Sequence, residues 1–272
     1  MMLRNISKHI KQRKNNNFLC YQLRSLWRHG CSLTDCRRFT PCNCISLFSN
    51  MDYIEHLKKD KKLAAFINST VHERIRPHKN IPLYLIGSIM SQQLNTKVAD
   101  IIYNRFLALY NNKEPKPQQV LKTPDEALRS TGLSNAKVSY VKNVAAFCVE
   151  HKITDKKLLA MSNDEVIALL TQIKGVGKWT VEMLLMFALG REDIFSIDDY
   201  GVQSAMIKIY KLEKSDKKQL REKLIKISGK WSPYRTYGCL YCWHWKDNAP
   251  VVRKIKQKSL KKPLRAAKVA NG

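Results

Sequence analysis

The sequence predicts an all-α protein with two helical lobes and a cleft between them. Across residues 51–250, apolar residues recur at the three- and four-residue spacing of helix faces. Several segments start with helix-capping patterns, and none shows a convincing strand pattern. We therefore expect about eight to ten helices, enough for two packed groups.

The first helices follow from their apolar spacing. An amphipathic pattern begins at residues 51–57, and Pro82 opens an apolar segment that reaches Met90. Helical spacing then continues from Val98 to Leu109.

Later helices also carry start signals. Thr123 is expected to cap a helix that has Pro124 at its first position and Glu126 at its third. Ser162 and Glu165 repeat the capping box before another helix. Between these two starts lies a further apolar stripe of helical spacing, formed by Val138, Val141, Ala145 and Cys148.

The charge of the chain favours a polyanionic partner. Its 272 residues carry a formal net charge of +27. Residues 1–50 hold nine Lys and Arg against one acid, and residues 251–272 hold eight against none. This excess suits nucleic acid better than a small acidic substrate. We find no stretch of roughly 18 apolar residues that would span a bilayer, so we expect no membrane partner.

We divide the chain into three parts. Residues 51–250 form the expected folded domain, and residues 251–272 form a basic tail that we expect to be disordered. Residues 1–50 form a basic extension with three open interpretations: a targeting presequence, a disordered extension, or a stretch upstream of a true start at Met51.

The most specific motif is a helix, a turn and a helix over residues 170–185. The turn, Gly175-Val176-Gly177, permits a tight backbone with exposed N–H groups. Amides at the start of a helix bind phosphate well. The acid pair Asp198-Asp199 follows, in a chain too basic to need it for solubility. A phosphate-binding turn beside a carboxylate indicates chemistry on DNA.

These residues carry a family resemblance. The turn reads Gly-Val-Gly-Lys-Trp-Thr from residue 175, and a second motif reads Phe-Ser-Ile-Asp-Asp-Tyr from residue 195. From Ile81 to Trp245 the chain resembles the helix-hairpin-helix DNA glycosylases, in the branch of bacterial DNA-3-methyladenine glycosylase II. The resemblance implies a monomeric base excision repair enzyme that requires no cofactor. It would flip an alkylated base such as 3-methyladenine out of double-stranded DNA and hydrolyse its N-glycosidic bond.

The resemblance assigns the catalytic carboxylate to Asp199, just before a helix expected near Tyr200. There it would stabilise positive charge on the sugar in the transition state. The alternative is a helix N-cap and nothing more, and Asp198 is expected to be structural. Bifunctional relatives have a lysine nucleophile where this chain has Trp179, so we expect a monofunctional enzyme that leaves an abasic site.

An aromatic base pocket is also implied. Trp179 and Trp243 match its walls, and aromatic rings attract the positive charge of N-alkylated bases. Met183 stands where the family has a pocket tyrosine, which leaves the lesion range open. Tryptophans on apolar faces are usually core residues. That alternative stays open for Trp179 and Trp243 and is favoured for Trp231 and Trp245.

The DNA contacts are carried over in the same way. Leu94 would insert into the duplex and Gln93 would contact the opposite strand, unless Leu94 only covers the core at a helix–helix turn. The amides of Gly175 and Gly177 would contact phosphate, with Lys178 directed towards the DNA backbone. In relatives, hairpin carbonyls also hold Na⁺ or K⁺, and here these carbonyls belong to Thr171, Ile173 and Val176.

The cysteines predict no iron–sulfur cluster. Cys239 and Cys242 form a Cys-x-x-Cys where relatives resembling endonuclease III carry a four-cysteine cluster, but no third or fourth cysteine follows. With Cys148 they are expected to be buried, reduced thiols of an intracellular protein. The other five cysteines lie in residues 1–50.

Two rival functions stay open. One is a glycosylase of the same fold with another specificity, for uracil, mismatched or oxidised bases. The other is a non-catalytic DNA-binding module in which Asp199 only caps a helix. The expected location is the cytoplasm with the nucleoid in a bacterium, or the nucleus or an organelle in a eukaryote.

Overall fold

The computed structural model describes residues 51–67, 74–213 and 216–248, and every regular element in these ranges is a helix. The expectations for residues 1–50 and 251–272 lie outside the described residues. None of the described helices is both long enough and apolar enough to cross a bilayer.

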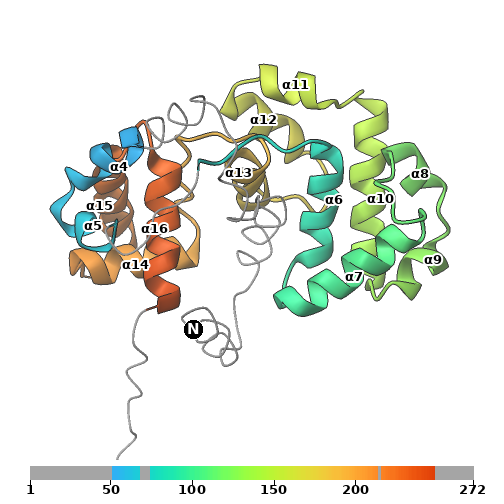
Figure 1. Ribbon diagram of the computed structural model, residues 1–272, viewed down its shortest axis with the longest axis horizontal. Coiled ribbons are helices and arrows are strands. Elements are labelled where there is room, and N and C mark those ends of the chain that lie inside the picture. Colours follow the sequence, from blue (N-terminus) through green and yellow to red (C-terminus); the bar gives the residue numbers. More distant parts are fainter. Residues whose placement is uncertain (1–50, 68–73, 214–215, 249–272) are drawn as a thin grey trace, which may run out of the picture.

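The helices form two groups (Figure 1). The central lobe comprises α6 to α10, on the right of the figure, and α11 to α13, in its middle; on the left, α4, α5 and α14 to α16 form the terminal lobe. The predicted all-α, two-lobed fold is confirmed. The bounds are α4 (Met51–Lys58), α5 (Lys61–Ile67), α6 (Ile81–Ser91), α7 (Thr96–Ala108), α8 (Pro117–Lys122), α9 (Asp125–Ser130), α10 (Asn135–Glu150), α11 (Asp155–Ala160), α12 (Asn163–Leu170), α13 (Lys178–Phe187), α14 (Tyr200–Tyr210), α15 (Lys217–Gly229) and α16 (Arg235–Asn248).

The described residues hold thirteen helices, more than the sequence predicted. Three of them, α8, α9 and α11, have only six residues each. Six residues are fewer than two turns, too few for an apolar face to repeat, so spacing alone does not identify such a helix. Helix α9 was expected only from its start signal.

Helix α10 organises the core of the central lobe. Its predicted apolar stripe is buried, and it packs against α6, α8 and α9. Ser134 caps its start by accepting a hydrogen bond from the Lys137 N–H. Helix α6 is buried on nearly all sides, which explains its continuous apolar sequence.

One predicted cap is confirmed and one is wrong. Ser162 and Glu165 form both bonds of the capping box at the start of α12. Thr123 does not cap α9, which begins at Asp125 without a side-chain cap. Its hydroxyl instead donates to the Gln119 carbonyl at 2.9 Å, at the end of the preceding helix α8.

Large aromatic side chains fill the terminal lobe. Trp231 is fully buried, and Gly238 makes room for it, because a Cβ on Gly238 would lie 2.3 Å from the indole ring. Tyr53 of α4 stacks on Tyr237 of α16 with ring centroids 4.0 Å apart. These contacts join the first and last described helices into one unit.

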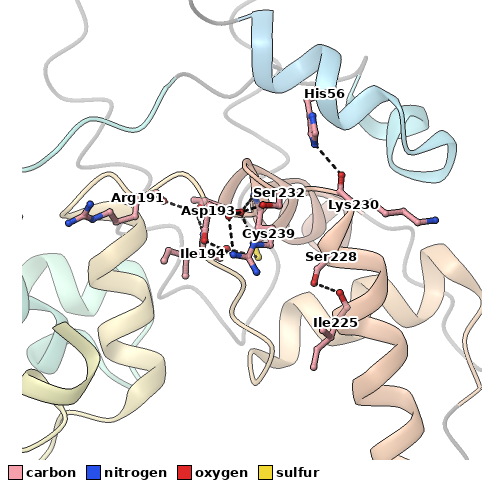
Figure 2. Close-up of polar contacts among 11 residues, drawn as sticks. His56, Arg191, Asp193, Ile194, Ile225, Ser228, Lys230, Ser232 and Cys239 are labelled. Carbon is pink, nitrogen blue, oxygen red and sulfur yellow. Dashed lines mark hydrogen bonds and ion pairs between the residues drawn. The ribbon is translucent and has the colours of Figure 1, made fainter. Parts of the chain in front are cut away.

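The crossover from α13 to α14, residues 188–199, is anchored on the start of α16 (Figure 2). Asp193 accepts hydrogen bonds from Ser232 Oγ at 2.9 Å and from Arg235 Nε at 2.6 Å. Burial acts to raise the pKa of Asp193, but the hydrogen bonds and charge of Arg235 hold that pKa below its usual value. This end of the crossover is thus tied to the terminal lobe.

The same crossover is tied to the central lobe. Arg191 Nη2 donates to the Leu159 and Met161 carbonyls at 3.0 and 2.8 Å. The His78 N–H donates to the Ala188 carbonyl at 2.8 Å, so the segment that leads into α6 runs beside the crossover. The crossover therefore sets the position of one lobe against the other.

Candidate active site

The hairpin between α12 and α13 depends on Gly175. This residue has a φ of 102°, and a Cβ there would lie 2.5 Å from the Tyr140 ring. Both the left-handed backbone and the close approach of the ring require glycine. The Val176 N–H donates to the Ile173 carbonyl at 2.9 Å and closes the turn.

The N-terminus of α13 faces open space. Gly177 is its N-cap; among the described residues, no side chain caps the helix and no atom lies within 4 Å of a Cβ placed on Gly177. The first amides of a helix have no partner within the helix, so here they are placed to receive an anion. Lys178 is exposed beside them, with Nζ 3.8 Å from Glu182 Oε1.

Three donors hold the carboxylate of Asp199. Asp199 is the N-cap of α14 and accepts the Val202 N–H at 2.8 Å. Trp179 Nε1 donates to Oδ2 at 2.9 Å, and Trp243 Nε1 donates to Oδ1 at 2.8 Å. The carboxylate therefore caps a helix and is also the meeting point of α13, α14 and α16.

Gly201 makes this meeting possible, and the sequence interpretation missed it. A Cβ on Gly201 would lie 2.8 Å from Trp243 Cδ1 and 2.9 Å from Asp199 Oδ1. A glycine in the first turn of an expected helix is unfavourable for helix formation. This unfavourable glycine was the only sign in the sequence that Trp243 and Asp199 approach the backbone at Gly201.

The proposed pocket residues differ in exposure. Trp179 is half-buried, Trp243 is 5% exposed, and Met183 has no exposed surface. Met183 faces the core, so in this state it offers no surface to a base. Trp231 is a core residue, and Trp245 packs edge-on against Phe66.

The neighbouring acids have other partners. Asp198 is about half exposed and pairs with Arg221 Nη1 at 2.5 Å, in agreement with a structural role. Glu182 is buried on α13 and accepts a hydrogen bond from Ser196 Oγ at 2.5 Å. Neither Arg221 nor Glu182 was singled out from the sequence, because their partners lie far along the chain.

The turn between α6 and α7 presents Gln93. This residue is exposed and has a φ of 60°, a left-handed conformation that is uncommon outside glycine. Lys137 Nζ braces the turn by donating to the Met90 and Gln92 carbonyls at 2.9 and 2.7 Å. Leu94 is partly buried and packs against the core. Both interpretations of the turn therefore keep support.

The three described cysteines are buried and free, as predicted. Burial raises the pKa of Cys148 and of Cys239 to about 12, so both thiols stay protonated near neutral pH. In the part of the chain that the structure describes, no three His, Cys, Asp or Glu side chains converge as metal ligands would.

Comparisons with known proteins point in one direction. The family model for the HhH-GPD superfamily base excision DNA repair protein matches residues 86–230. DNA-3-methyladenine glycosylase 1 of Schizosaccharomyces pombe is 32% identical over 200 residues, covering 73% of this chain and 86% of the relative.

Two solved structures superpose on the chain. A DNA-3-methyladenine glycosidase from Bacillus halodurans has a TM-score of 0.63 at 33% identity, covering 72% of this chain and 90% of that one. A 3-methyladenine DNA glycosylase from S. pombe, in complex with abasic DNA, has a TM-score of 0.63 at 32% identity, covering 72% of this chain and 97% of that one.

Proposed function

Because the chain belongs to the HhH-GPD superfamily of base excision DNA repair proteins, we propose that it is a monofunctional DNA glycosylase that releases alkylated bases such as 3-methyladenine. The observation that carries this proposal is the Asp199 carboxylate, fixed between the indole N–H groups of Trp179 and Trp243. Relatives named 3-methyladenine glycosylases support the alkylated base as substrate.

The chemistry follows from a carboxylate fixed in place. When the bond from C1′ to the base nitrogen breaks, its electron pair leaves with the base and positive charge develops on the sugar. Asp199 stabilises that charge in the transition state more than it stabilises the ground state, in which the sugar is uncharged, and this lowers the barrier. A water oxygen then bonds C1′ and loses a proton, which leaves an abasic site.

Water is the expected nucleophile because, among the described residues, the donors to Asp199 are two indole N–H groups and one backbone N–H, and none is an amine. The side chain at the position of the lysine nucleophile is Trp179, whose N–H already donates to the carboxylate. The nearest lysine in sequence, Lys178, directs its ammonium towards Glu182. The amine that forms a Schiff base in bifunctional relatives is therefore replaced at this position by an indole, which cannot form one.

Alkylated bases suit the aromatic surroundings. An N-alkylated purine carries a positive charge that an aromatic ring attracts by about 0.5–2 kcal/mol. It leaves as a neutral base, so its departure needs little help. Trp179 offers the most surface of the three proposed pocket residues. Because Met183 replaces a tyrosine of the family, a lesion range centred on another base is the second candidate function.

Double-stranded DNA would bind along the hairpin. The open amides at Gly177 and the exposed Lys178 form the phosphate contact. A Na⁺ or K⁺ ion on the carbonyls of Thr171, Ile173 and Val176 would add a bridge to phosphate.

A flipped base leaves a hole in the duplex that a side chain must fill. The turn between α6 and α7 would supply it: Leu94, which is partly buried, would insert into the duplex, and the exposed Gln93 would contact the opposite strand. One copy of the chain contains all of these parts, so we expect the enzyme to act as a monomer. We also expect it in the cellular compartment that contains the DNA.

The test is base release by the full chain from methylated duplex DNA, followed by mild alkali to cut abasic sites. We expect free 3-methyladenine, and strand breaks only after alkali. Release from uracil, mismatched or oxidised duplexes but not from methylated DNA would favour the second candidate. Tight, salt-sensitive DNA binding without release from any duplex would contradict both and leave a DNA-binding module.

A further inference from the structure

A second carboxyl group lies buried beside the proposed catalytic one. Glu182 is 4% exposed on α13, one turn beyond Lys178. Its Oε2 accepts a hydrogen bond from Ser196 Oγ at 2.5 Å, and Ser196 has no exposed surface. The chemistry proposed above uses neither side chain.

Keeping a carboxyl group at this position costs stability. Burial raises the pKa of Glu182, the Ser196 hydrogen bond and Lys178 act against that rise, and the charges of Asp198 and Asp199 add to it. An apolar side chain would pack on α13 without the cost of burying a charge. A buried acid next to a functional carboxylate is therefore a candidate for a role in function.

The contacts of Glu182 connect two parts of the site. On one side, Oε1 lies 3.8 Å from Lys178 Nζ at the DNA-facing end of α13. On the other, Ser196 begins the turn that carries the catalytic carboxylate, because the Asp199 N–H donates to the Ser196 carbonyl at 3.2 Å. Helix α13 also carries Trp179, which donates to Asp199 directly.

We propose that Glu182 is a positioning residue that acts through Ser196 to hold residues 196–199 against α13. The bond keeps Asp199 at the indole N–H of Trp179 while DNA engages the hairpin. This role rests on the proposed glycosylase function. A shift of a reacting group by about 1 Å costs up to roughly 100-fold in rate, so a loosened turn lowers the rate of base release more than the affinity for DNA.

The experiment compares Glu182→Ala, Ser196→Ala, the double variant and Glu182→Gln. We measure the single-turnover rate of base release at saturating enzyme and the Kd for the same duplex. Each alanine variant is expected to lose about 10- to 100-fold in rate with less than a twofold change in Kd. The double variant should lose no more than either single one, because both remove one hydrogen bond. Glu182→Gln keeps an acceptor for Ser196 and should recover most of the rate.

Val144→Ala serves as the control for lost stability. Val144 is fully buried on α10 and is not part of the hairpin, the acid pair or the Glu182–Ser196 bond, so this variant lowers the free energy of unfolding without removing that bond. At a temperature where it stays folded, its rate should equal that of the wild type. If Glu182→Ala does not fold, Ser196→Ala and Glu182→Gln carry the comparison.

Three outcomes would overturn the positioning role: unchanged rates in the alanine variants, losses that multiply in the double variant, or an equal loss in Val144→Ala. The indole N–H signal of Trp179 in an NMR spectrum gives a readout without activity. It should shift in Ser196→Ala and stay in place in Val144→Ala. If the wild type releases no base, the glycosylase proposal fails, and an unshifted Trp179 signal would separately refute the positional link.

Discussion

The hairpin edge and the aspartate network touch each other but are built in opposite ways. The hairpin edge, Gly175 to Lys178, has an uncapped helix start and open space over Gly177. The aspartate network consists of Trp179, Glu182, Ser196, Asp199 and Trp243. All of these residues except the half-buried Trp179 are buried, and their hydrogen bonds join three helices and a turn.

Under the proposed function, this difference places DNA binding at the hairpin edge and the chemistry in the aspartate network. A polyanion can be held by backbone amides and charge, which place few demands on side chains. A carboxylate that must meet one sugar atom needs donors fixed from several directions. Substitutions should therefore affect rate in the network and mainly affinity or folding at the edge.

The largest effect is expected for Asp199→Asn. Without the negative charge, the rate of base release should fall by about 10²–10³-fold or more. The Kd for DNA and its salt dependence should hardly change, since no phosphate contact is removed. Asp198→Asn is the matched control, because it removes only an exposed ion pair with Arg221. An equal loss of rate in both variants, or failure of Asp199→Asn to fold, would contradict the catalytic role of Asp199.

Gly175→Ala should have the next largest effect, on folding. Its Cβ would meet the Tyr140 ring in a left-handed backbone, which we expect to cost about 1–3 kcal/mol in the free energy of unfolding. Gly177→Ala is the control, because its Cβ would meet nothing within 4 Å and its φ is −90°. Urea unfolding and DNA affinity measure both variants. If Gly177→Ala lowered the free energy of unfolding as much as Gly175→Ala, the hairpin edge would not be open at Gly177.

Trp179→Phe tests one hydrogen bond of the aspartate network. It keeps a ring in place but removes the N–H that donates to Asp199. A hydrogen bond to a charged group is worth about 1.5–3 kcal/mol, so the rate should fall roughly 10- to 100-fold with little change in DNA affinity. A loss confined to Kd would instead identify Trp179 as a contact to the base or to DNA.

The smallest effect is the pH dependence of Glu182→Gln. Burial raises the pKa of Glu182 above 4.5, so the folded protein binds this proton more tightly than the unfolded chain. The resulting stabilisation is full below pH 4.5 and is lost as pH rises through the raised pKa. Glutamine does not titrate. The free energy of unfolding of the variant, relative to wild type, should therefore increase from acidic to neutral pH.

Urea unfolding at several pH values measures this difference. The charged and titratable groups that interact electrostatically with Glu182 are Lys178, Asp198, Asp199, Arg221 and Cys239. They are present in both proteins, so their direct contributions largely cancel. A difference that stays constant from pH 4.5 upwards would mean that Glu182 does not have a raised pKa.

Local patterns carried much of the site. The hairpin and the start of α14 were predictable because each lies within a few residues of continuous sequence, as does the capping box at Ser162. Thr123 shows the limit of such local prediction. Its hydroxyl could bond the start of α9 or the end of α8, and in the structure it donates to the Gln119 carbonyl at the end of α8. A local pattern identifies a group that can cap a helix, but packing decides which end it caps.

The sequence by itself determined the helical class, the glycine turn of the hairpin and the acid pair before α14, since spacing and residue type within short segments are enough for these. Only the tertiary structure decided that Trp179 and Trp243 both donate to the Asp199 carboxylate, although they are 20 and 44 residues away from it in the sequence. It also closed Met183 into the core and joined Glu182 to Ser196. These features depend on how helices cross, and crossing is set by side-chain packing over the whole molecule.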